Sequence, residues 1–129
     1  MNKIIVEVSV GELLDKISIL EIKQGKIKDP EKLKFINNEH SILKNQLENN
    51  VKSDEKLDSL YQSLKEINAK LWVIEDDKRQ CEKDKDFGEK FIKLSREVHF
   101  LNDDRAKIKL EINNHTGSII KEIKEYTSY

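Results

Sequence analysis

The chain of 129 residues has few of the residues that build turn-rich or disulfide-bonded folds: it contains one proline, four glycines and one cysteine. Aromatic residues make up 6% of the sequence, so neither a β-sandwich nor a turn-rich scaffold is favoured. The single cysteine, Cys81, excludes an intramolecular disulfide and a cysteine-cluster zinc site. Because Cys81 falls on the apolar stripe of a predicted helix, we interpret it as a small core residue.

Long apolar runs are also missing. The N-terminal run Ile4-Ile5-Val6 stops at Glu7, which is too short for the apolar region of a signal peptide. No segment approaches the roughly 18 consecutive apolar residues of a membrane span. We therefore expect a cytoplasmic protein with no membrane partner.

The sequence has no excess of positive charge, since 24 lysine and arginine residues stand against 25 aspartate and glutamate residues. Binding along a nucleic-acid backbone depends on such an excess, so we expect no nucleic-acid partner. Charged residues make up 38% of the chain and hydrophobic residues 36%, a balance typical of long helices that each bury one apolar stripe. The regular phase of the apolar residues argues against disorder.

The dominant feature is a pair of long amphipathic segments between residues 53 and 115. Apolar residues recur at intervals of three and four in both segments, which predicts two helices of about 29 residues, each roughly 43 Å long. Between them, Asp84-Lys85-Asp86 precedes Phe87-Gly88, a short polar break that makes the two helices antiparallel neighbours. The sequence therefore predicts a coiled-coil-like helical hairpin.

Two shorter helices are predicted before the hairpin. Ser9 and Glu12 form a capping box that starts the first helix, and its apolar residues lie on more than one side, which indicates a central position or a subunit interface. Asp29 and Pro30 have the pattern of an N-cap and first position of a second helix, which fades near residue 50. After the hairpin, Gly117 is predicted to cap the last helix in the left-handed conformation.

The two ends of the chain carry β-branched residues. Residues 3–8 alternate apolar and polar positions and residues 118–124 are rich in isoleucine, so they either pair as strands or lie as extended tails on the helices. The fold class we predict is all-α: a four-helix bundle built on the long hairpin, in one domain spanning residues 1–129, with short extended ends. The hairpin outreaches the first helix pair by more than roughly 10 Å, which leaves apolar surface uncovered and predicts self-association, most simply a homodimer.

Polar side chains interrupt the apolar stripe of every predicted helix, at Gln24, His40, Lys78 and Arg105. A buried charge without a partner costs several kcal/mol, so Lys78 and Arg105 need carboxylates, a ligand or solvent. If the hairpin turns near residue 86, Arg105 lies level with residues 66–68 of the other arm, and carboxylate partners are available inside the hairpin.

The densest polar cluster lies at residues 102–109, where Asn102, Arg105 and Lys109 share one helix face. Arginine offers a planar fork and lysine a point charge for a phosphate or carboxylate. The leading functional hypothesis is a non-catalytic bundle that binds a small anionic, nucleotide-like ligand between helices. Its predicted site consists of Lys16, Arg79, Asn102, Arg105 and Lys109. The alternative is a protein–protein interaction or assembly module in which these residues are structural.

Enzyme signatures are weak. A metal-dependent nucleotide hydrolase that uses Glu12, Asp15, Glu75 and Asp103 is a third hypothesis, because carboxylates three residues apart on a helix can share a metal. The sequence has no glycine-rich phosphate loop and no nucleophile elbow. We therefore predict neither catalytic residues nor a metal or other cofactor.

Several stretches resemble an uncharacterised domain family of bacteria and phages: residues 8–23 (VSVGELLDKISILEIK), 71–76 (LWVIED), 87–88, 102–109 (NDDRAKIK) and 116–118. The resemblance covers nearly the whole chain and is weakest at residues 48–60. It implies no established activity. It does imply an occurrence alone or near genes for surface polysaccharides and glycosyltransferases, which makes nucleotides or nucleotide sugars candidate ligands.

Overall fold

A computed structural model describes residues 2–129 and consists of four helices. They are α1 (Val10–Lys26), α2 (Pro30–Asn50), α3 (Glu55–Asp84) and α4 (Glu89–Thr116). The predicted all-α class is confirmed. Within residues 2–129 there is no strand, so the two ends of the chain do not pair with each other within one chain. Residues 3–8 are all exposed, so this end does not pack on the helices either.

The helix ends follow the local signals in the sequence. Ser9 Oγ accepts a hydrogen bond from Glu12 N at 3.1 Å, and Asp29 caps α2 with Pro30 at its first position. Asp54 Oδ1 accepts from Leu57 N at 2.8 Å at the start of α3. Gly117 ends α4 with φ 66°, as predicted. The capping box is only half formed, because the Glu12 carboxylate turns to Lys109 of α4 instead of its own helix end.

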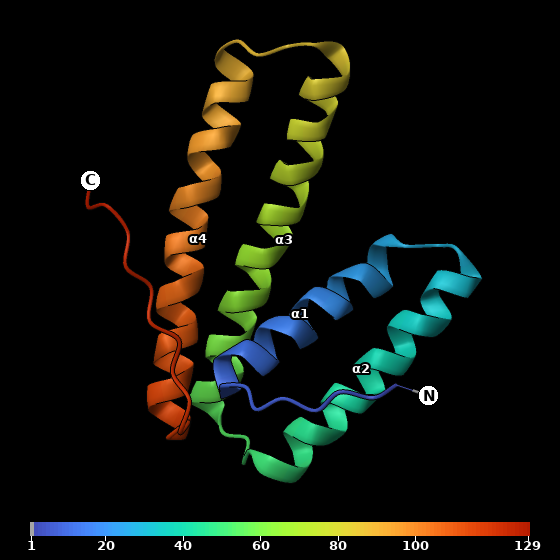
Figure 1. Cartoon of the computed structure of the whole chain (residues 1–129), viewed down its shortest axis with the longest axis vertical. Helices are drawn as coiled ribbons and strands as arrows, with labels where there is room; N and C mark the ends of the chain where they lie inside the picture. The colour runs from blue at the N-terminus through green and yellow to red at the C-terminus, as the bar shows by residue number, and fades with distance from the viewer. Residues whose placement is uncertain (1) are drawn as a thin grey trace.

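The long hairpin of α3 and α4 forms one side of the molecule, and α1 packs across its base (Figure 1). α2 lies against α1 on the side away from the hairpin. This position explains why α1 has buried residues on more than one side whereas α2 has none. The arrangement is thus a bundle around α1, from which the far half of the hairpin projects.

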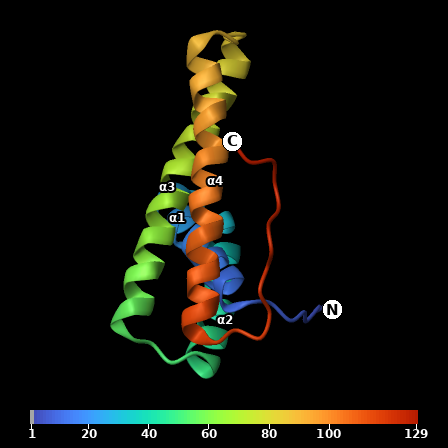
Figure 2. The same cartoon turned by 90° about the vertical axis from the view of Figure 1, so that its left-hand side faces the viewer.

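The core lies where the base of the hairpin meets α1. Leu14 of α1, Leu57 and Leu64 of α3 and Ile112 of α4 form one buried cluster. The C-terminal residues 118–129 then turn back and run beside α4 (Figure 2). We call this segment the C-terminal strap. No helix within residues 2–129 combines the length and the apolar character needed to cross a membrane.

Candidate functional site

A buried carboxylate joins three helices at the base of the hairpin. Asp15 of α1 is 2% exposed. Its Oδ1 accepts hydrogen bonds from Arg105 Nε of α4 at 3.0 Å and from Asn68 Nδ2 of α3 at 2.8 Å, and its Oδ2 accepts one from Arg105 Nη2. Lys109 Nζ lies 3.4 Å from Asp15 Oδ2. This fork between a guanidinium and a carboxylate fixes the register of α1 on the hairpin.

Small and polar residues allow the close approach of α1 that this pairing requires. Gly11 N donates to Asn113 Oδ1 of α4 at 2.7 Å, in a buried contact. A Cβ atom at Gly11 would lie 2.6 Å from the backbone oxygen of Lys109, so only glycine fits there without displacement. One turn after Asp15, Ser18 Oγ accepts a second hydrogen bond from Asn68 Nδ2 at 2.7 Å. Every buried donor of this layer that the structure describes therefore has a partner.

The ionisable groups of this layer stay charged. Burial by itself would raise the pKa of Asp15, but hydrogen bonds from Arg105 and Asn68 and the nearby positive charges outweigh burial, and its pKa lies below the ordinary value. The hydrogen bond to Asp15 raises the pKa of Arg105. Burial lowers the pKa of Lys109, yet the hydrogen bond to Glu12 and the surrounding carboxylates outweigh it and raise that pKa.

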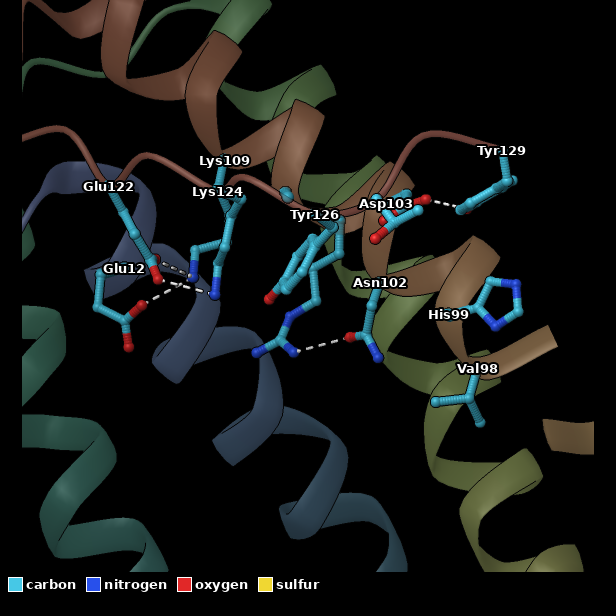
Figure 3. A pocket seen from close by; sticks show the side chains of 13 residues that line it. Glu12, Val98, His99, Asn102, Asp103, Lys109, Glu122, Lys124, Tyr126 and Tyr129 are labelled. Carbon is cyan, nitrogen blue, oxygen red and sulfur yellow. Dashed lines mark hydrogen bonds and ion pairs between the residues drawn. The ribbon is translucent and has the colours of Figure 1, made fainter. Parts of the chain in front are cut away.

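A cavity of about 730 Å³ opens above this layer, between the start of α1, one face of α4 and the C-terminal strap. Figure 3 shows its lining side chains, among which Glu12, Lys109 and Glu122 point toward one another. The residues that line the cavity are Glu12 of α1, Val98, His99, Asn102, Asp103, Arg105, Ala106 and Lys109 of α4, and Glu122, Lys124, Tyr126, Thr127 and Tyr129 of the strap. Its size matches that of pockets for small molecules and cofactors.

The strap is attached mainly at its two ends and by one ion pair between them. At its start, Ser118 Oγ accepts a hydrogen bond from Val10 N at 3.2 Å. In its middle, Glu122 Oε2 lies 3.5 Å from Lys109 Nζ. At its end, the Tyr129 hydroxyl donates to Asp103, and the Tyr129 ring packs edge-on against the His99 ring at 5.3 Å between centroids.

Three of the five predicted site residues come together in this cavity: Asn102, Arg105 and Lys109. Lys16 is exposed on α1 and reaches only Glu12, at 3.9 Å, without lining the cavity. Arg79 is exposed in the last two turns of α3, near the tip of the hairpin. The structure therefore brings the three predicted residues of α4 together in one cavity and does not bring Lys16 or Arg79 to them.

The structure adds lining residues that the sequence interpretation missed. Glu122, Lys124 and Tyr126 belong to the strap, and His99 lies one turn before Asp103 on α4. The isoleucine-rich residues 118–124 were predicted to be extended, either paired as a strand or lying on the helices. No local signal indicated that they would follow α4.

The predicted partners of the interrupting polar residues need one correction. Arg105 does lie level with Asn68, because both bind Asp15, but its carboxylate partner comes from α1 and not from the hairpin. Lys78 has no carboxylate partner among the described residues and places its Nζ 5.7 Å from the centre of the Phe91 ring. A cation over an aromatic face is a favourable alternative to an ion pair.

A second polar cluster holds α2 and α3 to α1. Glu21 Oε1 accepts from the Tyr61 hydroxyl and lies 3.3 Å from Lys65 Nζ, while Glu21 Oε2 lies 3.0 Å from His40 Nε2. Burial would raise the pKa of Glu21, but these three partners outweigh it and lower that pKa. Because every member pairs with Glu21, we interpret this cluster as structural.

The carboxylates proposed as metal ligands, Glu12, Asp15, Glu75 and Asp103, do not assemble. Within residues 2–129 there is no group of three or more histidine, cysteine, aspartate or glutamate residues arranged to hold a metal ion. Asp15 is instead engaged by Arg105 and Lys109. The hydrolase hypothesis has no ligand set in this geometry.

A model of a family described as "Family of unknown function (DUF6165)" matches residues 4–129. No curated protein and no solved structure matches the chain.

Proposed function

Since the chain belongs to this family of unknown function, DUF6165, we propose its role from the site alone: it binds a small anionic, nucleotide-like ligand in the cavity under the C-terminal strap, without catalysis. The proposal rests on one observation: Asn102, Arg105 and Lys109 of α4 line the same cavity as polar and aromatic residues of the C-terminal strap. Convergent polar groups in a cavity of this size are the usual mark of a ligand site.

Arg105 supplies the anion-binding group. A guanidinium carries five N–H groups, and the hydrogen bonds to Asp15 and Asn102 use three of them. The two remaining N–H groups are available to an oxygen of a phosphate or carboxylate. Since Asp15 fixes the guanidinium plane, these donors are held in place before a ligand arrives, which lowers the entropy cost of binding.

Aromatic side chains supply the second half of the recognition. Tyr126 and Tyr129 of the strap and His99 of α4 line the same cavity as Arg105. Planar aromatic groups stack on nucleobases or on the apolar faces of sugars. A ligand that combines a ring with an anionic group, such as a nucleotide or a nucleotide sugar, fits this pairing of side chains.

The test is a thermal-shift screen against nucleotides, cyclic nucleotides and nucleotide sugars, with and without magnesium. A compound that binds only the native state raises its melting temperature, and we expect a saturating rise of several degrees for one class. The variant Asn102→Ala removes a lining residue, and Asn114→Ala changes an exposed asparagine of α4 outside the cavity. We expect the first to weaken binding roughly fivefold, the loss of about one hydrogen bond, and the second to leave it unchanged. A flat screen with all compounds would refute the proposal.

A second candidate function, an assembly module that forms a homodimer, is favoured by the projecting half of the hairpin. There Val73, Ile92 and Phe100 are exposed, and a shallow groove of about 660 Å³ runs between α3 and α4 beside them. Sedimentation equilibrium tests this candidate. If the protein is an assembly module, the wild type should be a dimer and the Val73→Asp variant a monomer. A monomeric wild-type protein would exclude this candidate.

A further inference from the structure

Three carboxylates lie near the Lys109 ammonium group, at different distances and with different exposure to solvent. Its Nζ lies 2.7 Å from Glu12, 3.4 Å from Asp15 and 3.5 Å from Glu122. The Glu122 side chain is 45% exposed, compared with 33% for Glu12 and 2% for Asp15. Long, exposed ion pairs contribute little to stability, so Glu122 is the partner that Lys109 loses most easily.

The segment that carries Glu122 is loosely packed. Residues 119–129 are all exposed, and a second cavity of about 690 Å³ is lined by residues of the strap and of α4. Ile123, the apolar residue next to Glu122, is 77% exposed and so does not anchor the segment. Between Ser118 and Tyr129, the contact of Glu122 with Lys109 is therefore the main charged link between the strap and α4.

The charges around the cavity are balanced. Among the side chains that line it, the positive charges of Arg105, Lys109 and Lys124 are matched by the negative charges of Glu12, Asp103 and Glu122. An added anion would leave an excess of negative charge, unless one of these carboxylates moves away. Glu12 is held by its short contact with Lys109, and Asp103 accepts a hydrogen bond from the Tyr129 hydroxyl. Asp15, below the cavity, is held by four contacts in the protein interior, which leaves Glu122.

We infer that the C-terminal strap is an internal competitor of the ligand: the Glu122 carboxylate occupies the anion position on Lys109, and the anionic group of the ligand takes its place. This inference rests on the proposed function. The exchange limits the excess of negative charge at the site, since the Glu122 carboxylate leaves Lys109 as the anionic group of the ligand arrives. Tyr126 and Lys124 move with Glu122, so the strap rearranges over the ligand when the exchange occurs.

The experiment uses the tyrosines of the full-length protein. There are three, Tyr61, Tyr126 and Tyr129, so protein labelled with 3-fluorotyrosine gives three fluorine resonances. Two report on the strap, and Tyr61, which is bound to Glu21 between α1 and α3, serves as the internal control. The probe is inorganic pyrophosphate, titrated at low ionic strength because salt screens exposed charges. The variants are Glu122→Gln and, as the matched control, Glu125→Gln, an exposed glutamate of the strap that lines neither cavity.

We expect pyrophosphate to move the Tyr126 and Tyr129 resonances and to leave Tyr61 in place. In Glu122→Gln, half-saturation should occur at a roughly two- to fivefold lower pyrophosphate concentration than in wild type, because one exposed competing charge has been removed. In Glu125→Gln, the concentration at half-saturation should be the same as in wild type. Equal affinities in wild type and Glu122→Gln, or weaker binding in Glu122→Gln, would overturn the role of the strap while the anion site stands. Unchanged resonances in all three proteins would overturn the anion site itself and the inference with it.

Discussion

The two glycines of α1 provide a matched test of how closely this helix must approach α4. An alanine Cβ at position 11 would lie 2.6 Å from the backbone oxygen of Lys109, whereas ordinary contacts begin at 3.4 Å. The helices would have to separate by roughly 0.8 Å at this point, and such overpacking costs about 1–3 kcal/mol. The separation also stretches the buried hydrogen bond from Gly11 N to Asn113 Oδ1, now 2.7 Å, which adds about 1 kcal/mol.

At Gly25 the same substitution should have the opposite effect on stability. A Cβ atom there meets nothing within 4 Å, and the residue lies inside the helix. Alanine is a better helix former than glycine, so Gly25→Ala should raise the free energy of unfolding by about 0.5–1 kcal/mol. Urea denaturation followed by circular dichroism measures both variants, and we expect Gly11→Ala to be less stable than wild type by about 2–4 kcal/mol. If Gly11→Ala were as stable as Gly25→Ala, the close packing of α1 on α4 would be wrong.

Further predictions concern Asp15 and Glu21, two carboxylates that join helices. Asp15→Asn should lower the free energy of unfolding by about 2–4 kcal/mol, because it leaves partly buried cations without their counter-charge, and a loss below about 1 kcal/mol in urea denaturation would contradict this role. Because the folded-state pKa of Asp15 lies below its ordinary value, the carboxylate contributes stability above the ordinary aspartate pKa and loses it as pH falls through the folded value. The wild type should therefore lose more stability than Asp15→Asn between about pH 5 and pH 3 in thermal melts. Tyr61→Phe removes a donor to Glu21 and should cost about 1–2 kcal/mol, while Tyr126→Phe, exposed in the strap, should change stability by less than about 0.5 kcal/mol.

Features encoded by neighbouring residues were predictable from the sequence. Asp29 and Pro30 at the start of α2 and Gly117 after α4 act within one helical turn, so their types alone predict the boundaries. That Asn102, Arg105 and Lys109 line one cavity was predictable for the same reason. Residues 102, 105 and 109 share a face on any helix, whatever packs against it.

Features that depend on how distant segments meet were not predictable. Arg105 was expected to find a carboxylate in the hairpin, but Asp15 lies closer because α1 crosses the base of the hairpin at that level. Arg79 has the same side-chain chemistry as Arg105, yet it lies near the end of α3 at the tip of the hairpin, where neither α1 nor α2 covers the hairpin. The strap is the extreme case, because an extended segment held by a few exposed contacts leaves no periodic signal in the sequence.

Amide chemical-shift mapping shows directly whether the cavity under the strap binds an anionic ligand. Isotope-labelled protein would be titrated in turn with ADP, UDP and UDP-glucose. We expect saturating shifts for at least one of them, concentrated on residues 99–109 of α4, the start of α1 and the strap. No shifts at millimolar concentrations, or shifts concentrated on α2 or the tip of the hairpin, would contradict it.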